Sequence, residues 1–364
     1  MATKDVTNGE NIIIKGMKSL TLPLLAIISA LVLGAIIIIL MKLDPIKAYQ
    51  SLLKGSLGST NAIGETLVKT TPLIFTGLSF ALAKRCGLIN LGAEGQLYMG
   101  GFLATVVGIY IKGLPLFIHL PLAILAGFIG GGLWGLLAAW LKVKFGASEL
   151  ITTIMLNYIA IHWVSYLVTG PMKEPPGNFP QTPAVELSAQ LPRILPGTRL
   201  HLGLIVALLA IVLFYIFLWK TTVGYETRVV GQNIDAARYA GINPERNAYL
   251  AMFIAGGFGG MAGMNEILGI QQRLFQAFSP GYGFDGIAVA LLGQNTPIGI
   301  LLSGILFGIL RSGANMMQMA AKVPIAVIYI IQALVIMFVV GSSIFTMLQK
   351  RRSLAAAAKG GNVQ

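Results

Sequence analysis

The sequence predicts an all-α fold: a polytopic transmembrane helical bundle of about ten spans, within a range of roughly eight to eleven. Composition is the first reason for this prediction. Hydrophobic residues make up 55% of the 364 residues and charged residues only 11%, whereas a soluble domain carries about 25% charged residues. The second reason is a series of apolar runs along the chain, because a membrane-spanning helix needs about 20 mostly apolar residues.

These runs form a membrane domain at 20–345 between two polar tails, 1–19 and 346–364. They lie at 20–41, 62–83, 88–111, 119–141, 148–169, 201–219, 247–270, 284–292, 297–311 and 323–345. The run at 20–41 is longer than the apolar part of a signal peptide, and no small-x-small cleavage site follows it, so we expect a first span there. The run at 284–292 is too short to cross a bilayer upright, which leaves the number of spans open.

The distribution of Lys and Arg predicts that both chain ends are cytoplasmic. With this orientation and an even number of spans, most of the 26 basic residues fall in cytoplasmic segments, as the positive-inside rule requires. Lys42, Lys47 and Lys54, in the polar segment after the first run, are exceptions. The net charge of +13 does not indicate a nucleic-acid partner, because the basic residues are dispersed beside apolar runs, where membrane lipid headgroups lie.

Two polar segments interrupt the apolar pattern. The segment 170–200 contains seven Pro residues, which exclude a long helix, and we expect an external loop. The segment 220–246 is the longest cytoplasmic loop. Within it we expect a short helix over 234–240, which Asn233 or Asp235 would begin and Gly241 and Pro244 would end.

Glycines spaced four residues apart recur within the apolar runs, as at Gly127, Gly131 and Gly135 and at Gly256 and Gly260. Small residues let membrane helices approach closely. We therefore expect tight helix packing at these positions.

A polar, glycine-rich break precedes two of the apolar runs. The first break contains Asn90, Glu94 and Gln96, and the second contains Asp285 in the same Gly-x-acid-Gly pattern. Broken segments at corresponding places in two halves of a chain indicate the substrate site of a transporter. The first would start near the cytoplasmic side and the second near the outside, which is consistent with an inverted repeat; each acid could instead cap its helix.

Three further polar residues lie within predicted spans, where unpaired polar groups are costly. They are Asn157, Asn265 and Glu266. Contact with a transported solute is one explanation. The alternatives are a buried hydrogen-bonding network or an ion pair with Arg273 for Glu266, and an interhelical hydrogen bond for the asparagines.

Several motifs that would support chemistry are absent. No Gly directly precedes a Lys, which excludes the P-loop that binds ATP. The single cysteine and three scattered histidines offer no metal-binding spacing, and no nucleophile elbow is found. We therefore expect neither an enzyme nor a metal or cofactor on this chain, so energy for uphill transport would come from an ion gradient or from another subunit.

Asp235-Ala236-Ala237-x-x-x-Gly241 resembles the Glu-Ala-Ala-x-x-x-Gly loop of ATP-binding-cassette importer permeases. The stretch 224–262 resembles the branched-chain amino acid/ribose-type family of these permeases, and residues 88–96 resemble its simple sugar/nucleoside subgroup. The likeness extends from about residue 60 to 345. The resemblance implies a coupling loop that contacts an ATPase through Gly224, Arg228, Gly231, Asp235, Ala236, Ala237, Arg238 and Gly241.

The resemblance also implies an importer in a bacterial cytoplasmic membrane and the partners that serve it. A cytoplasmic ATP-binding-cassette ATPase would hold ATP and Mg²⁺ and drive alternating access. A second homologous permease, commonly in a heterodimer, would complete the pathway, and an extracellular lipoprotein or periplasmic protein would deliver a nucleoside or simple sugar. The alternative function is an ion-gradient-driven secondary transporter of a small polar solute. The exact solute and the choice between homodimer and heterodimer stay open.

Overall fold

The computed structural model describes residues 25–177, 179–338 and 341, and these form two compact units. The predicted tails at 1–19 and 346–364 lie outside the described residues. The larger unit comprises 53–312; the smaller combines the two ends of the chain, up to Leu52 and from Gly313. The described residues are mostly helical, and their only β-type pairings are isolated bridges, which confirms the all-α prediction.

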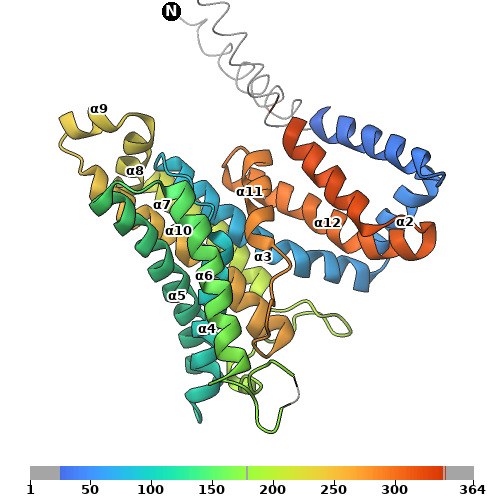
Figure 1. Ribbon diagram of the computed structural model, residues 1–364, viewed down its shortest axis with the longest axis horizontal. Coiled ribbons are helices and arrows are strands. Elements are labelled where there is room, and N and C mark those ends of the chain that lie inside the picture. The colour runs from blue at the N-terminus through green and yellow to red at the C-terminus, as the bar shows by residue number, and fades with distance from the viewer. Residues whose placement is uncertain (1–24, 178, 339–340, 342–364) are drawn as a thin grey trace, which may run out of the picture. The chain divides into compact units, whose positions relative to one another are not determined.

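The larger unit is built from long helices joined by shorter ones (Figure 1). In chain order they are α3 (Thr60–Arg85), α4 (Ala93–Tyr110), α5 (Leu116–Phe145), α6 (Glu149–Thr169), η1 (Leu187–Ala189), α7 (Gly203–Lys220), α8 (Thr222–Gln232), α9 (Ile234–Tyr239), α10 (Pro244–Glu266), η2 (Ile267–Gln271, a π-helix), α11 (Tyr282–Leu292) and the first part of α12 (Pro297–Ala321). Among the described helices, α3, α5, α6, α7 and α12 are long and apolar enough to cross a membrane. The predicted number of ten spans is not confirmed.

Local capping explains where several helices begin and end. The Ser59 hydroxyl accepts the Ala62 N–H at 3.1 Å and begins α3. Asn243 accepts the Arg246 N–H at 3.0 Å, and Pro244 follows it at the first position of α10. Gly146 ends α5 with a φ of 68°, a left-handed conformation that glycine adopts without strain.

The core of the larger unit lies where α4, α5 and α10 meet at glycines. A side chain on Gly100 would overlap the backbone of Gly260, and one on Gly131 would overlap the backbones of Gly256 and Gly260. Backbones this close exclude any residue with a Cβ. The packing role predicted for the glycines at 127–135 and 256–260 is therefore confirmed.

The connection between α6 and α7, which covers the predicted loop 170–200, is folded onto the segment after α10. Backbone hydrogen bonds join Leu191 to Leu268 and Val185 to Gln272, both at 2.9 Å. Arg273 forms an ion pair with Glu174 in this connection. The predicted pairing of Glu266 with Arg273 is therefore wrong, because Arg273 lies beyond the π-helix and faces the loop.

The smaller unit contains the helix Leu25–Leu40, most of α2 (Pro45–Leu57), the end of α12 and the helix Ile325–Phe338. The Tyr49 hydroxyl donates to the Leu31 carbonyl at 2.6 Å, and Gly34 packs directly against Ile331. Sequence analysis treats the segment after residue 41 as a connection, and α2 is an additional helix. Its start is nevertheless marked in the sequence, because Asp44 caps the N–H of Ile46 at 2.8 Å and Pro45 follows.

Candidate functional site

The segment α8–α9 lies at one end of the larger unit, and the α6–α7 connection lies at the other (Figure 1). The Thr221 hydroxyl accepts the Gly224 N–H at 3.0 Å and begins α8. Asn233 accepts the N–H groups of Asp235 and Ala236 at 3.0 and 3.1 Å and begins α9. The short helix predicted over 234–240 is present, whereas α8 is a helix that sequence analysis describes only as loop.

The tip of this segment is exposed. Asp235, Ala236 and Arg238 are exposed, the Tyr239 side chain is 95% exposed, and Ile234 is 49% exposed. Ala237 alone is fully buried in α9. Gly241 has a φ of 76° and turns the chain back toward α10. The tip thus exposes two large side chains, Tyr239 and Ile234, and two charged ones of opposite sign, Asp235 and Arg238.

The base of the segment, by contrast, is joined closely to the membrane helices. A side chain on Gly224 would overlap the Phe217 carbonyl of α7, and one on Gly231 would overlap the Arg85 carbonyl of α3. The Thr227 hydroxyl bonds to Asn247 of α10 at 3.2 Å. The base of α8 is thus in direct contact with α3, α7 and α10.

Arg228 of α8 and Arg85 of α3 both contact Trp219 of α7, and Arg85 also contacts the turn between α11 and α12. The guanidinium groups of Arg85 and Arg228 lie over the Trp219 ring at 5.4 and 5.9 Å, a cation–π arrangement. Arg85 also donates to the Asn295 carbonyl at 3.0 Å. This contact extends the mechanical connection of α8 to the α11–α12 turn.

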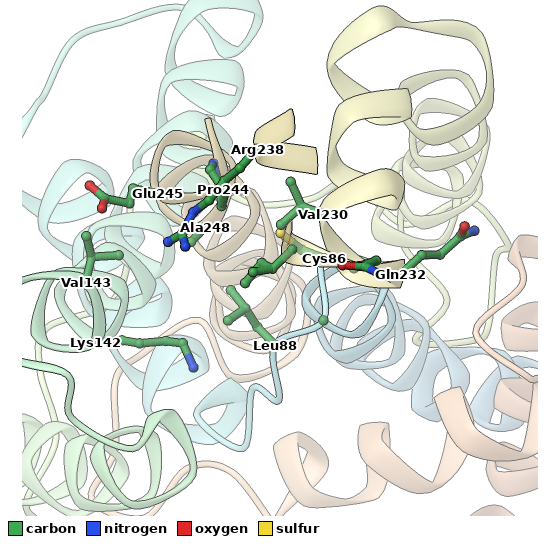
Figure 2. Close-up of a pocket in the computed structure, with 14 residues that line it drawn as sticks. Cys86, Leu88, Lys142, Val143, Val230, Gln232, Arg238, Pro244, Glu245 and Ala248 are labelled. Carbon is green, nitrogen blue, oxygen red and sulfur yellow. The ribbon is translucent and has the colours of Figure 1, made fainter. Parts of the chain in front are cut away.

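A cavity of about 410 Å³ lies beside this segment (Figure 2). Its walls come from the ends of α3 and α5, the α8–α9 segment and the start of α10. They include Cys86, Lys142, Gly231, Arg238 and Glu245. Burial raises the pKa of the Cys86 thiol to about 12, so the thiol stays protonated at neutral pH and is not a nucleophile. No group of three metal-ligating side chains occurs in the described part of the chain.

The first predicted break is held by three buried amide side chains and one hydroxyl. We name this group the amide network; it consists of Asn90, Gln96, Asn157 and Ser79. Asn90 and Gln96 exchange two hydrogen bonds, of 2.9 and 3.0 Å, and Asn90 also donates to Ser79 at 3.1 Å. Asn157 accepts the Gly95 N–H at 2.7 Å and donates to the Leu91 carbonyl at 2.8 Å. These side chains fix the backbone before α4 and cap its first turn.

The two predicted breaks meet. Glu94, in the first turn of α4, accepts the N–H of Gly283, in the first turn of α11, at 2.7 Å. From this point α4 runs toward the α6–α7 connection, where the Gly108 carbonyl accepts from Glu186, and α11 runs toward Arg85 and α8. Sequence analysis expects the two helices to start at opposite sides of the membrane, but they start together and run in opposite directions.

Asp285 belongs to a charged group on α11 and α12. Its carboxylate pairs with Arg311 at 3.2 Å, and the Arg311 side chain is only 9% exposed. Arg311 also lies 4.5 Å above the Tyr282 ring and donates to the Pro280 carbonyl at 2.8 Å. Lys69 of α3 donates to the backbone carbonyl of Arg311 at 3.2 Å. Arg311 was not among the predicted site residues; examining basic as well as acidic residues in apolar runs would have found it.

Glu266 and Asn265 end α10 directly before the π-helix η2, a type of turn that is frequent at functional sites. Both are buried, at 4% and 0% exposure. Within the described structure, neither amide atom of Asn265 nor the Oε1 of Glu266 has a hydrogen-bond partner. The cations that act on the Glu266 carboxyl are Arg311, Arg199 and Lys69, of which Arg199 also pairs with Glu65 at 2.5 Å.

Comparison with known proteins defines the class to which this architecture belongs. The family model "Branched-chain amino acid transport system / permease component" matches residues 62–340, and the chain belongs to this family. It is therefore the permease subunit of an ABC transporter, a multi-pass membrane protein that is not itself an enzyme and works with a separate ATPase and a substrate-binding protein. The comparisons give no support to an ion-gradient-driven transporter.

Three relatives are similar over nearly their whole length. The guanosine ABC transporter permease protein of Bacillus subtilis is 40% identical over 90% of this chain and 95% of its own. The glucose ABC transporter permease protein of Haloferax volcanii is 39% identical over 89% of this chain and 87% of its own. The nucleoside ABC transporter permease protein of Lactococcus lactis is 35% identical, with 93% and 96% covered. No solved structure matches the chain.

Proposed function

We propose that the chain imports a nucleoside or a simple sugar across the bacterial cytoplasmic membrane by alternating access. Relatives named for guanosine, nucleosides and glucose support this range of solutes. ATP and Mg²⁺ bind to the separate ATPase, and its ATP hydrolysis supplies the energy. Both chain ends and the α8–α9 segment face the cytoplasm.

The observation that carries this proposal is the contrast within the α8–α9 segment. Its tip exposes Tyr239 and Ile234, and its base is locked to α3, α7 and α10 through Gly224, Gly231 and Thr227. Exposed aromatic residues are the usual anchors of protein interfaces. We infer that the ATPase binds the tip and that the base transmits the motion of the ATPase to the membrane helices.

We also propose a second permease in the complex. Bacillus subtilis and Lactococcus lactis each have another permease of the same name that is 29% identical to this chain. A pair of permeases in each of these organisms supports a heterodimer. The substrate-binding protein would contact the opposite end of the larger unit, at the α6–α7 connection.

For the pathway we favour Asn265, Glu266 and Asp285. Asn265 and Glu266 retain unpartnered polar atoms, and Asp285 is 23% exposed in its side chain. Four other residues already have hydrogen-bond partners within the two glycine-rich breaks: Asn90, Glu94, Gln96 and Asn157. We infer that these four shape the pathway and that the other three contact solute.

Reconstitution tests the function. The chain, its partner permease, ATPase and binding protein are placed in proteoliposomes, and uptake of labelled guanosine and glucose is measured with ATP and with a non-hydrolysable analogue. We expect ATP-dependent accumulation of one of these solutes. Uptake of neither solute, or accumulation by the chain alone on a proton gradient, would contradict the proposal.

The docking surface is tested by Tyr239→Ala. Removal of an interface anchor weakens binding by about tenfold or more, and the exposed position predicts an unchanged thermal unfolding midpoint. Affinity for the ATPase is measured with the purified permease pair. Phe179→Ala is the matched control, because Phe179 is 69% exposed in the α6–α7 connection; equal losses for both variants would contradict docking at α9.

A further inference from the structure

Three buried side chains with unpartnered polar atoms occur where the start of α7 meets the end of α10. They are His201, Asn265 and Glu266, at 1%, 0% and 4% exposure, and together we name them the α10 polar cluster. In the part of the chain that the structure describes, His201 Nε2, both Asn265 amide atoms and Glu266 Oε1 have no hydrogen-bond partner. Buried polar groups normally have partners, so several orphans at one place point to a ligand.

Two glycines keep His201 and Asn265 close together. A side chain on Gly203 would overlap the Asn265 carboxamide oxygen and would lie 2.8 Å from the His201 ring. One on Gly269, in the π-helix, would come within 2.7 Å of His201 Nδ1. The Asn265 carboxamide and the His201 ring thus both pack directly against Gly203, and the His201 ring also packs against Gly269.

Glu266 directly follows Asn265 at the end of α10 and is buried as well. Arg199, two residues before His201, is one of the charges that act on the Glu266 carboxyl. The other cations that act on it are Lys69 and Arg311, on α3 and α12. Arg199 is paired with Glu65 and Arg311 with Asp285, and within the described structure Glu266 Oε1 has no hydrogen-bond partner.

The chemistry of these groups defines what they can bind. The Gly203 N–H donates to His201 Nδ1 at 3.2 Å, so the neutral ring carries its proton on Nε2 and offers a donor. Asn265 offers a donor and an acceptor, and Glu266 offers only acceptors. A hydroxyl group both donates and accepts, so adjacent hydroxyls satisfy this set, and a carboxylate that binds ribose hydroxyls is known from dinucleotide sites.

We propose that the α10 polar cluster binds the adjacent hydroxyl groups of the transported solute. Glu266 accepts from one hydroxyl, and Asn265 and His201 bond to its neighbour. This inference rests on the proposed function and deepens it. Ribose in a nucleoside and a hexose both carry adjacent hydroxyls, so one cluster serves either solute class.

The test compares Glu266→Gln with wild type in the reconstituted complex, using guanosine and 2′,3′-dideoxyguanosine. For each protein the kcat/KM for guanosine is divided by the kcat/KM for 2′,3′-dideoxyguanosine to give a ratio. The binding protein is the same throughout, so its own preference cancels when variant and wild type are compared. A hydrogen bond to a charged group is worth about ten- to hundredfold, and we expect the ratio to fall by about tenfold.

Glu94→Gln is the matched control, because Glu94 is an equally buried carboxylate that accepts from the Gly283 N–H and bonds to the Ser279 side chain. We expect it to lower uptake of both solutes in proportion and to leave the ratio unchanged. If Glu266→Gln fails to reach the membrane, Asn265→Leu is measured in the same way. A second arm with glucose and 2-deoxyglucose applies the same comparison to a hexose and tests its 2-hydroxyl.

The outcomes separate the two proposals. Guanosine or glucose uptake by wild type with an unchanged ratio in Glu266→Gln overturns the hydroxyl site and leaves the importer intact. A wild-type complex that carries neither solute overturns the proposed function, and the hydroxyl site with it. A lowered ratio in Glu266→Gln but not in Glu94→Gln supports the site.

Discussion

The amide network before α4 and the polar cluster at the end of α10 are both built from buried polar side chains in a membrane protein, but their hydrogen bonds differ. Asn157 bonds to Gly95 and Leu91, whereas both amide atoms of Asn265 lack partners within the described structure. Both asparagines are almost completely buried. Burial of a polar residue therefore does not by itself distinguish a structural role from a binding role; the state of its hydrogen bonds does.

The largest loss of stability is expected from a substitution that disrupts the amide network. Asn157→Leu removes the partner of the buried Gly95 N–H and of the partly buried Leu91 carbonyl. Each orphaned backbone group costs about 1–3 kcal/mol, so we expect a loss of roughly 2–4 kcal/mol in the free energy of unfolding. Thermal unfolding in detergent would measure it, and a midpoint equal to wild type would contradict the structural role.

An intermediate effect is expected at the ion pair of Asp285 and Arg311. Asp285→Asn leaves a guanidinium that is only 9% exposed without its counter-charge. Since removal of one partner of a buried pair costs about 3–5 kcal/mol and this pair is partly open, we expect roughly 1–3 kcal/mol. Adding Arg311→Leu should restore most of the lost stability. If the double variant were less stable than Asp285→Asn, the pair would not be the source of the loss.

The smallest expected effect sharpens the comparison. Asn265→Leu introduces the same side chain as Asn157→Leu, but it removes an amide that has no partner to lose. We expect a change in the free energy of unfolding within about 1 kcal/mol, of either sign. A loss as large as that of Asn157→Leu would show that Asn265 has a structural bond.

The sequence was sufficient to predict the helical class, the glycine packing and the ends of α9, because these depend on local composition and capping. Asn233 and Gly241 mark that helix on their own. The helix α8 was missed because Gly224 and Gly231 occur within it; both are required by close contact with Phe217 and Arg85, which are brought there by the fold.

The roles of the predicted pathway residues could not be deduced from the sequence. Asn157 bonds to Gly95 across 62 positions of the chain and Glu94 to Gly283 across 189. Whether such a residue is satisfied depends on which distant segment meets it. The same reason explains why His201 was not singled out: its unpartnered nitrogen has meaning only beside Asn265.

Guanosine uptake per folded complex, measured for Asn157→Leu and Asn265→Leu in parallel, tests the central comparison most directly. The account predicts that Asn265→Leu complexes are as stable as wild type but lose most uptake. Asn157→Leu complexes should be less stable, and those that remain folded should keep more of their uptake than Asn265→Leu complexes. Wild-type uptake by Asn265→Leu, together with lost uptake in fully stable Asn157→Leu, would contradict the account.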